Sequence, residues 1–213
     1  MEFIDRHKVD APAWLLENAE QWGKEWEERC RSGRRFEWRQ SGGHDKHELT
    51  KLLSDMTSRH CSYCDAYPMG RRIKETIDHF CPKTTHPRLA YCWDNLFLCC
   101  YCCQERNNRF DELLLKPDEP AYDFDDYFYI DWDTGELHPL GKPGERRYER
   151  AQITLKLFKL NDNGKPDDRR EELEKYEQDQ GNAELDLYSY RFYLRRGTKS
   201  TPHDQVPTPG ASS

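Results

Sequence analysis

Several features that mark membrane proteins and secreted proteins are scarce in this chain of 213 residues. No stretch approaches the roughly 20 apolar residues of a membrane-spanning helix, so we expect no association with a membrane. The first six residues carry charges where a secretory signal has an apolar run, so we expect a cytoplasmic protein. Apolar residues are only 35% of the chain, which predicts a core that depends on aromatic side chains and on a metal.

Positive charge is also in deficit, since 33 Lys and Arg face 40 Asp and Glu, a formal net charge of −7. Phosphate binding, however, needs clustered Lys and Arg rather than a positive total. Two clusters occur, one of Arg29, Arg31, Arg34, Arg35 and Arg39, and one of Arg71, Arg72 and Lys74. Residues 118–136 hold eight acidic residues and no basic one. The charge is therefore segregated, and the negative total does not exclude a nucleic-acid binder.

Nine cysteines is an odd number, which argues against a fully paired disulfide scaffold and favours thiolates that bind a metal in a reducing compartment. Two Cys-x-x-Cys pairs, Cys61 with Cys64 and Cys100 with Cys103, can close a tetrahedral four-thiolate zinc site. Cys99 with Cys102 is an alternative register for the second pair. The zinc would hold the intervening chain in a fixed small fold.

Between the two pairs lie Asp78-His79 and, sixteen residues after His79, Asn95. A histidine accepts a proton near neutral pH, and one divalent metal ion plus one general base can hydrolyse a phosphodiester. If Asp78 and His79 lie on a strand, their side chains point to opposite faces. The residues alone do not show how both would serve one site.

The order Cys-x-x-Cys, Asp-His, Asn-Leu, Cys-x-x-Cys resembles the HNH (ββα-metal) nuclease superfamily. The resemblance implies that Asp78 binds the catalytic metal, that His79 is the general base and that Asn95 braces the loop that carries the histidine. It also favours Cys100 and Cys103 as zinc ligands, because they keep the family spacing from Asn95.

The chain departs from the family pattern after the second cysteine pair. Gln104 stands at the position of the second ligand of a catalytic Mg²⁺ or Mn²⁺, where Asn or His is usual, and Asn107 replaces the usual Lys. Gln104 still offers a carbonyl oxygen, but on a side chain one methylene longer, which predicts a loosely held metal. Asn107 or Asn108 could take its place.

From about residue 12 to 196 the chain is similar to small bacterial HNH proteins of antiphage defence, including those that accompany an ATPase in Septu and some retron systems. The resemblance implies an α+β fold in which a zinc-stapled ββα-metal core is embedded in a mostly helical domain. We expect a helical region at 1–60, the HNH module at 61–116, an acidic and helical segment at 117–196, and a disordered tail at 197–213. The expected elements are a strand near 76–80, a segment at 95–99 that leads into the second cysteine pair, a turn at 133–135, and helices at 11–30, 47–58, 102–115, 150–160, 169–178 and 185–195.

These observations predict a metal-dependent endonuclease that acts on nucleic acid, with DNA favoured over RNA and an ATPase as its partner. The candidate nucleic-acid contacts are Arg71, Arg72, Lys74 and Lys83. Two alternatives remain, an RNA-cleaving enzyme and a zinc-stabilised binding or scaffold subunit whose HNH site has decayed. The second alternative rests on the departures at Gln104 and Asn107.

Overall fold

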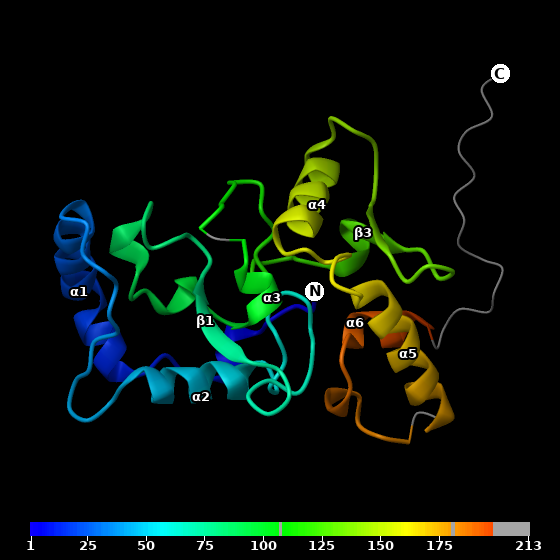
Figure 1. Ribbon diagram of the computed structural model, residues 1–213, viewed down its shortest axis with the longest axis horizontal. Coiled ribbons are helices and arrows are strands. Elements are labelled where there is room, and N and C mark those ends of the chain that lie inside the picture. Colours follow the sequence, from blue (N-terminus) through cyan, green and yellow to red (C-terminus); the bar gives the residue numbers. More distant parts are fainter. Residues whose placement is uncertain (107, 180–181, 198–213) are drawn as a thin grey trace.

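The computed structural model describes residues 1–106, 108–179 and 182–197, which form an α+β fold. The six α-helices within these residues are α1 (Ala13–Arg31), α2 (Lys46–Met56), α3 (Tyr101–Gln104), α4 (Arg146–Leu157), α5 (Lys165–Gln178) and α6 (Arg191–Gly197). Two antiparallel two-stranded sheets pair β1 (Glu75–His79) with β2 (Leu96–Cys100), and β3 (Phe128–Ile130) with β4 (Leu137–Pro139). The β1–β2 hairpin lies between α1 and α5, which occupy opposite sides of the molecule (Figure 1).

The two N-terminal helices form where their apolar spacing predicts them. Pro12 precedes the first residue of α1, and the carboxylate of Asp45 accepts the backbone N–H of His47 at the start of α2. The apolar stripe of α1 is core packing, because Trp14, Trp22 and three further residues are buried. At Gly23, an added Cβ would lie 2.5 Å from the Arg88 carbonyl oxygen, so only glycine allows the close approach of α1 to residues 87–89.

The β1–β2 sheet is the centre of the predicted module. Strand β1 begins one residue before the predicted strand, and the segment expected to lead into the second cysteine pair forms β2. The register pairs Glu75 with Cys100 at one end and His79 with Leu96 at the other. All five residues of β2 are buried, so this strand reads as a continuous apolar run rather than an alternating one. Helix α3 follows β2 without an intervening loop.

The helix predicted at 102–115 is wrong beyond its first turn, because α3 ends at Gln104. Two residues later the chain turns inward and buries the side chain of Arg106, whose backbone carbonyl accepts the N–H of Arg109. Asn108 has a φ of 62°, in the left-handed region that terminates helices. The helix was predicted from the spacing of apolar residues, and that spacing gives no sign that an arginine is buried through its hydrogen bonds.

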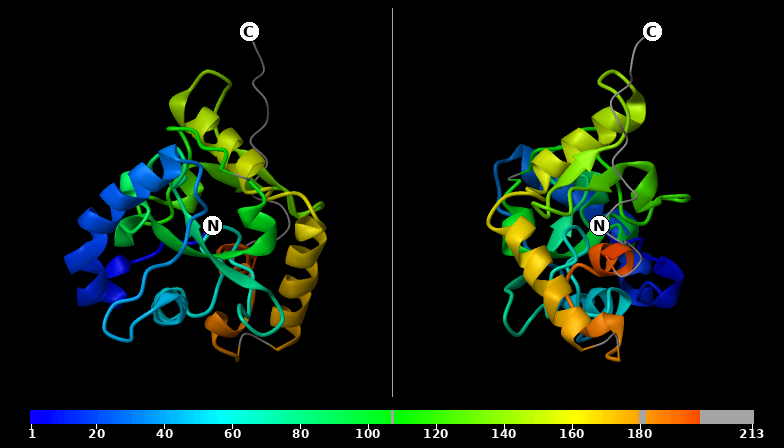
Figure 2. Two further views of the ribbon diagram at one scale, coloured as in Figure 1. Left: turned by 60° about the vertical axis from the view of Figure 1, so that its left-hand side comes forward. Right: turned by 90° about the vertical axis from the view of Figure 1, so that its right-hand side faces the viewer.

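The C-terminal elements follow the prediction with one interruption. The turn predicted at 133–135 joins β3 to β4, with Gly135 at a φ of 76°. Helices α4 and α5 both begin four residues before their predicted starts. The helix predicted at 185–195 is divided into a 3-10 turn (Leu185–Leu187) and α6, which are drawn in orange and red in Figure 2. The division occurs because Tyr190 has a φ of 58° and donates its N–H to the Asp65 carbonyl. Of the predicted tail, Gly197 belongs to α6, and residues 198–213 lie outside the described residues.

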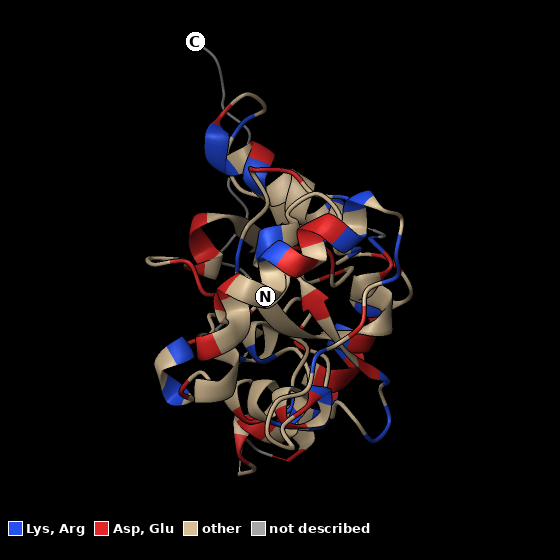
Figure 3. Cartoon of the chain, turned by 90° about the vertical axis from the view of Figure 1, so that its left-hand side faces the viewer, with Lys and Arg blue, Asp and Glu red and all other residues tan. Residues whose placement is uncertain are grey.

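Charges of both signs are interspersed on the side of the molecule that Figure 3 shows. Three arginines of the first basic cluster form ion pairs with glutamates, namely Arg29 with Glu37, Arg31 with Glu27 and Arg39 with Glu25. Arg34 and Arg35 are exposed. None of the described helices has the length and apolar character needed to cross a membrane.

Candidate metal centre and active site

Four cysteine side chains meet at the end of the hairpin where Glu75 pairs with Cys100. The Sγ atoms of Cys61, Cys64, Cys100 and Cys103 all lie within 4.8 Å of one another, and all four residues are buried. This confirms the predicted grouping of these cysteines and excludes the alternative register in this structure. Cys99 instead directs its thiol to the Cys100 carbonyl, 3.1 Å away, and Cys102 is partly exposed. Such a cluster can hold a structural metal such as zinc.

The surroundings of the cluster favour a negative charge on Cys61, whereas hydrogen bonds within the cluster raise the pKa values of Cys64 and Cys103. The backbone N–H of Cys100 donates to Cys61 Sγ over 3.3 Å, and the N–H of Cys103 donates to Cys100 Sγ over 3.4 Å. Although burial opposes ionisation, hydrogen bonds from the thiols of Cys100, Cys103 and Cys64 hold the pKa of Cys61 well below its ordinary value. Burial likewise disfavours the charged form of Lys165, yet the neighbouring cysteines raise its pKa. These N–H groups and this cation can compensate the charge of a zinc thiolate site.

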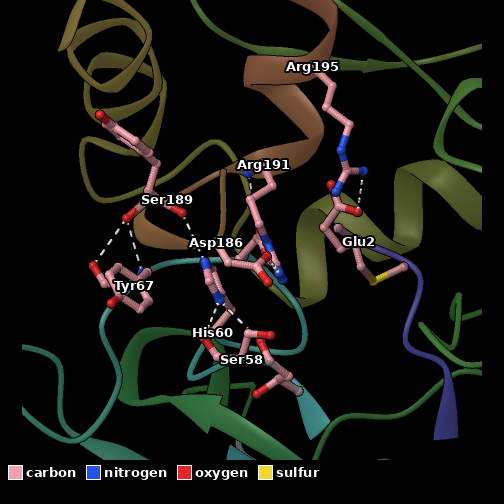
Figure 4. A network of polar contacts seen from close by, with 12 residues as sticks. Glu2, Ser58, His60, Tyr67, Asp186, Ser189, Arg191 and Arg195 are labelled. Atoms are coloured by element: carbon pink, nitrogen blue, oxygen red, sulfur yellow. Dashed lines mark hydrogen bonds and ion pairs between the residues drawn. The ribbon is translucent and has the colours of Figure 1, made fainter. Parts of the chain in front are cut away.

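The first cysteine pair is fastened to the C-terminal part of the chain by a polar network (Figure 4). Asp65, directly after Cys64, accepts hydrogen bonds from the backbone and the guanidinium of Arg191, with Nη2 at 2.7 Å from Oδ1. His60, directly before Cys61, is fully buried and places its Nε2 2.9 Å from the Tyr188 carbonyl oxygen. Residues more than 120 positions apart therefore hold the loop that presents Cys61 and Cys64.

Asp78 lies near the other end of the hairpin with one carboxylate oxygen engaged and one free. Its Oδ2 accepts hydrogen bonds of 2.8 Å from the Tyr63 hydroxyl and from Arg106 Nη2. Burial raises the pKa of Asp78, and the charge of Arg106 acts in the opposite direction. Among the described residues Oδ1 has no hydrogen-bond partner, and it is not sealed from solvent. This oxygen is the one that a divalent cation can reach.

Arg106 was not identified from the sequence. Its side chain is 2% exposed, and its Nη2 also donates to the carbonyl oxygens of His79 and Phe80, at 2.6 and 2.9 Å. One guanidinium thus fixes both the carboxylate and the backbone at the end of β1. The only signal in the sequence is its position two residues after Gln104, and no general rule marks an arginine there as buried.

The imidazole of His79 faces away from Asp78, as alternation along a strand requires. Its Nε2 lies 3.0 Å from the carbonyl oxygen of Ala90. A carbonyl can only accept, so Nε2 carries the proton and Nδ1 offers a lone pair. Burial lowers the pKa of His79 to about 3, so the ring is neutral at pH 7. Nδ1 has no hydrogen-bond partner among the described residues, so its lone pair is free, but the low pKa makes it a weak base while the ring is buried.

Asn95 closes the loop between the two strands. Its Oδ1 accepts the backbone N–H of Cys81 at 2.7 Å, and its Nδ2 donates to the carbonyls of Cys81 and Leu89 at 2.9 and 3.0 Å. The Asn95 carbonyl also accepts the N–H of Phe80. Since Ala90 follows Leu89, this clamp holds the carbonyl that orients His79.

Among the hydrogen bonds of the described residues, none joins Gln104 to Asp78. Its Nε2 donates to the hydroxyl of Thr76 over 3.1 Å, two residues before Asp78 on the same face of β1. Of the alternatives, Asn108 is exposed, and Asn107 lies outside the described residues. The structure therefore brings Asp78, His79 and Asn95 to one end of the hairpin and leaves Gln104 beside Thr76.

The predicted nucleic-acid contacts are dispersed. Arg71 and Arg72 are exposed in the turn before β1, and Lys74 lies with its Nζ 5.9 Å from the ring centre of Tyr101. Lys83 lies closer to the site, with its Nζ 5.1 Å from the ring centre of Phe36, and burial lowers its pKa.

Neither a family model nor a curated protein matches the chain. The residues around Asp78 and His79 therefore provide the basis for assigning a function.

Proposed function

We propose that the protein is a metal-dependent endonuclease with an HNH-type site at Asp78 and His79. One observation carries the proposal. Two adjacent residues each have one polar atom held by the protein and a second, complementary atom left free. For Asp78 the free atom is Oδ1, and for His79 it is Nδ1. A free carboxylate oxygen suits a divalent cation, and an unprotonated imidazole nitrogen suits a general base.

In this mechanism His79 Nδ1 accepts a proton from the attacking water, while the Ala90 carbonyl keeps the proton on Nε2. Asp78 Oδ1 would hold Mg²⁺ or Mn²⁺, which commonly use one or two protein carboxylates together with water and phosphate oxygens. When bound, the metal would supply positive charge where negative charge grows on the phosphate. Asn95 keeps the Ala90 loop in place, and Arg106 keeps Oδ2 occupied so that Oδ1 is the available oxygen.

The substrate in this proposal is nucleic acid, with DNA favoured, and its capture is assigned to exposed arginines and to an ATPase partner in antiphage defence. Contacts from Arg71 and Arg72 to phosphate would position the backbone without reading its sequence. The overall negative charge supports dependence on a partner, because only short basic segments are available for phosphate binding. Such a protein would act in the cytoplasm.

The second candidate is a zinc-stabilised binding or scaffold subunit. The ion pair between Arg106 and Asp78 favours it, because Arg106 already compensates the charge that a catalytic metal would otherwise meet. The cysteine cluster serves either function equally well. The two candidates differ in whether the protein hydrolyses phosphodiesters at all.

Cleavage of supercoiled plasmid in Mg²⁺ or Mn²⁺ separates the two candidates. We expect His79→Ala to lower the cleavage rate by about 10²–10⁴-fold, the usual contribution of a general base. His86→Ala is the control, because His86 lies in the same loop outside the site and should cut as the wild type does. Equal cleavage by His79→Ala would remove His79 from the mechanism, and no cleavage by the wild type would favour the scaffold function. A parallel assay on RNA identifies the preferred sugar.

A further inference from the structure

The imidazole of His79 is covered by a segment that precedes it by about forty residues. We call residues 32–40 the aromatic strap. The Trp38 ring stacks on His79, with a centroid distance of 5.4 Å and an interplanar angle of 16°. The Phe36 ring meets His79 edge-on at 5.2 Å and also contacts Trp38 at 5.2 Å. As a result only 4% of His79 is exposed, although the proposed function requires water and a phosphate to reach it.

The strap has few attachments other than these rings. It contains neither helix nor strand, and the backbone N–H groups of residues 35–40 donate to no backbone carbonyl among the described residues. One side chain fixes its backbone, the Tyr91 hydroxyl, which donates to the Glu37 carbonyl over 2.7 Å. The strap rings also pack on the body of the protein, Phe36 against Trp26 at 5.1 Å and both rings against Tyr91. Two ion pairs at the surface, Arg29 with Glu37 and Arg39 with Glu25, are further attachments. A segment with few backbone hydrogen bonds opens at low cost in free energy.

The contrast with the rest of the His79 surroundings is marked. Below the ring, Asn95 clamps the loop with three side-chain hydrogen bonds, and the Ala90 carbonyl holds Nε2. Above the ring, aromatic contact alone joins the strap to His79. Exposed ion pairs contribute about 0–1 kcal/mol each, so these add little to closure. The cover can therefore open while the site beneath it keeps its geometry.

We propose that the aromatic strap is an autoinhibitory lid that must leave His79 before nucleic acid can be cleaved. This inference rests on the proposed nuclease function for its purpose, but the covering of His79 can be measured without it. The ring stack makes Trp38 the main closing residue, and the Tyr91 hydroxyl holds the strap backbone in place.

Diethyl pyrocarbonate, which acylates unprotonated imidazole nitrogens, measures access to His79 directly. The chain has eight histidines, so the modified residue is identified by mass spectrometry of peptides. Loss of the Trp38 ring pairs should raise the open population, and hence the rate at His79, by about tenfold or more in Trp38→Ala. Tyr91→Phe removes only the hydroxyl, keeps the ring in the core and should give a smaller increase. Because Tyr91→Phe removes a single hydroxyl group, this variant should fold normally. It therefore still tests the lid if Trp38→Ala does not fold.

Tyr129→Ala is the matched control, because Tyr129 also stacks on a histidine, His138, at 5.1 Å but far along the chain from His79. It should leave the His79 rate unchanged. Unchanged His79 reactivity in both Trp38→Ala and Tyr91→Phe would overturn the lid. Faster acylation of His79 together with faster plasmid cleavage in the variants would support the lid. If the wild type cleaves plasmid and the variants show faster acylation but no faster cleavage, the strap does not inhibit the enzyme. Raised reactivity with no cleavage by any variant means that the strap covers His79 and that the nuclease proposal fails.

Discussion

The two ends of the β1–β2 hairpin are built on different principles. At the Cys100 end, four side chains of one kind converge on a common centre, with the Sγ atoms of Cys64 and Cys100 3.7 Å apart. At the His79 end, about 13 Å away along five residues of strand, Asp78 and His79 point to opposite faces and each depends on a separate set of neighbours. At the first end the cysteines themselves form the centre, and distant residues such as Arg191 hold only the loop that presents two of them. At the second end, distant segments position each functional group directly.

This difference predicts at which end of the hairpin a substitution also unfolds the protein. A four-cysteine cluster joins residues 36 positions apart, so a bound metal contributes folding free energy to the whole module. The residues at the Asp78 end position functional atoms and contribute less to the stability of the whole module. Variants that separate stability from activity are therefore expected at the Asp78 end and not at the cysteine end.

The largest effect is expected from loss of the zinc site. Structural zinc contributes about 10–16 kcal/mol of apparent binding free energy, which matches the whole stability of an ordinary domain. Cys61→Ser or a strong chelator should therefore abolish the cooperative thermal transition, measured by circular dichroism alongside the zinc content. Cys102→Ser is the control, because Cys102 lies beside the cluster but outside it. A chain that contains no zinc when purified, or a Cys61→Ser variant as stable as the wild type, would contradict this prediction.

Removal of Arg106 tests whether the second end depends on its remote support. Arg106→Ala leaves the buried carboxylate of Asp78 without its cation, and breaking a buried pair costs about 3–5 kcal/mol. We expect a loss of this size in urea unfolding, with the zinc content unchanged. The neighbouring exposed Arg109→Ala should cost far less. A loss below about 1 kcal/mol in Arg106→Ala would show that the ion pair does not organise this end.

The same contrast explains what could be predicted from the sequence. The cysteine spacing, the Asp-His pair, the hairpin turn at Gly135 and the amphipathic helices are local patterns, and the structure contains these elements close to where they were expected. Arg106 and the aromatic strap escaped prediction because their partners are 28 and about 40 residues away, and neither follows a repeating pattern. The helix that was expected to continue to Leu115 failed for the same reason, since burial of Arg106 turns the chain out of α3.

A smaller effect is expected at Asn95, which joins the two ends of the loop between the strands. Asn95→Ala removes three hydrogen bonds, each of which contributes about 1 kcal/mol net. We therefore expect about 3 kcal/mol of lost stability and slower cleavage, since the Ala90 carbonyl that orients His79 is released. Asn95→Asp keeps an acceptor for the Cys81 N–H but sets a buried carboxylate oxygen against two carbonyl oxygens, so it should lose at least as much stability. Equal stability of the alanine variant and the wild type would show that the loop is held without this clamp.

The smallest expected effect concerns Gln104, whose amide is bonded to Thr76 rather than placed beside Asp78. If Gln104 serves as a second metal ligand, its amide must leave Thr76 in the loaded enzyme, and Mn²⁺ should support cleavage better than Mg²⁺, which demands stricter octahedral geometry. Gln104→Asn, which shortens the side chain by one methylene, should then lower the metal concentration for half-maximal cleavage. Gln104→Ala should raise it by less than about tenfold, or 1.4 kcal/mol. Thr76→Val removes the hydroxyl that holds the amide away and should act in the same direction as Gln104→Asn. Identical metal titrations for the wild type and all three variants would assign Gln104 to the packing of α3 on β1 and leave Asp78 as the one protein ligand proposed for the catalytic metal.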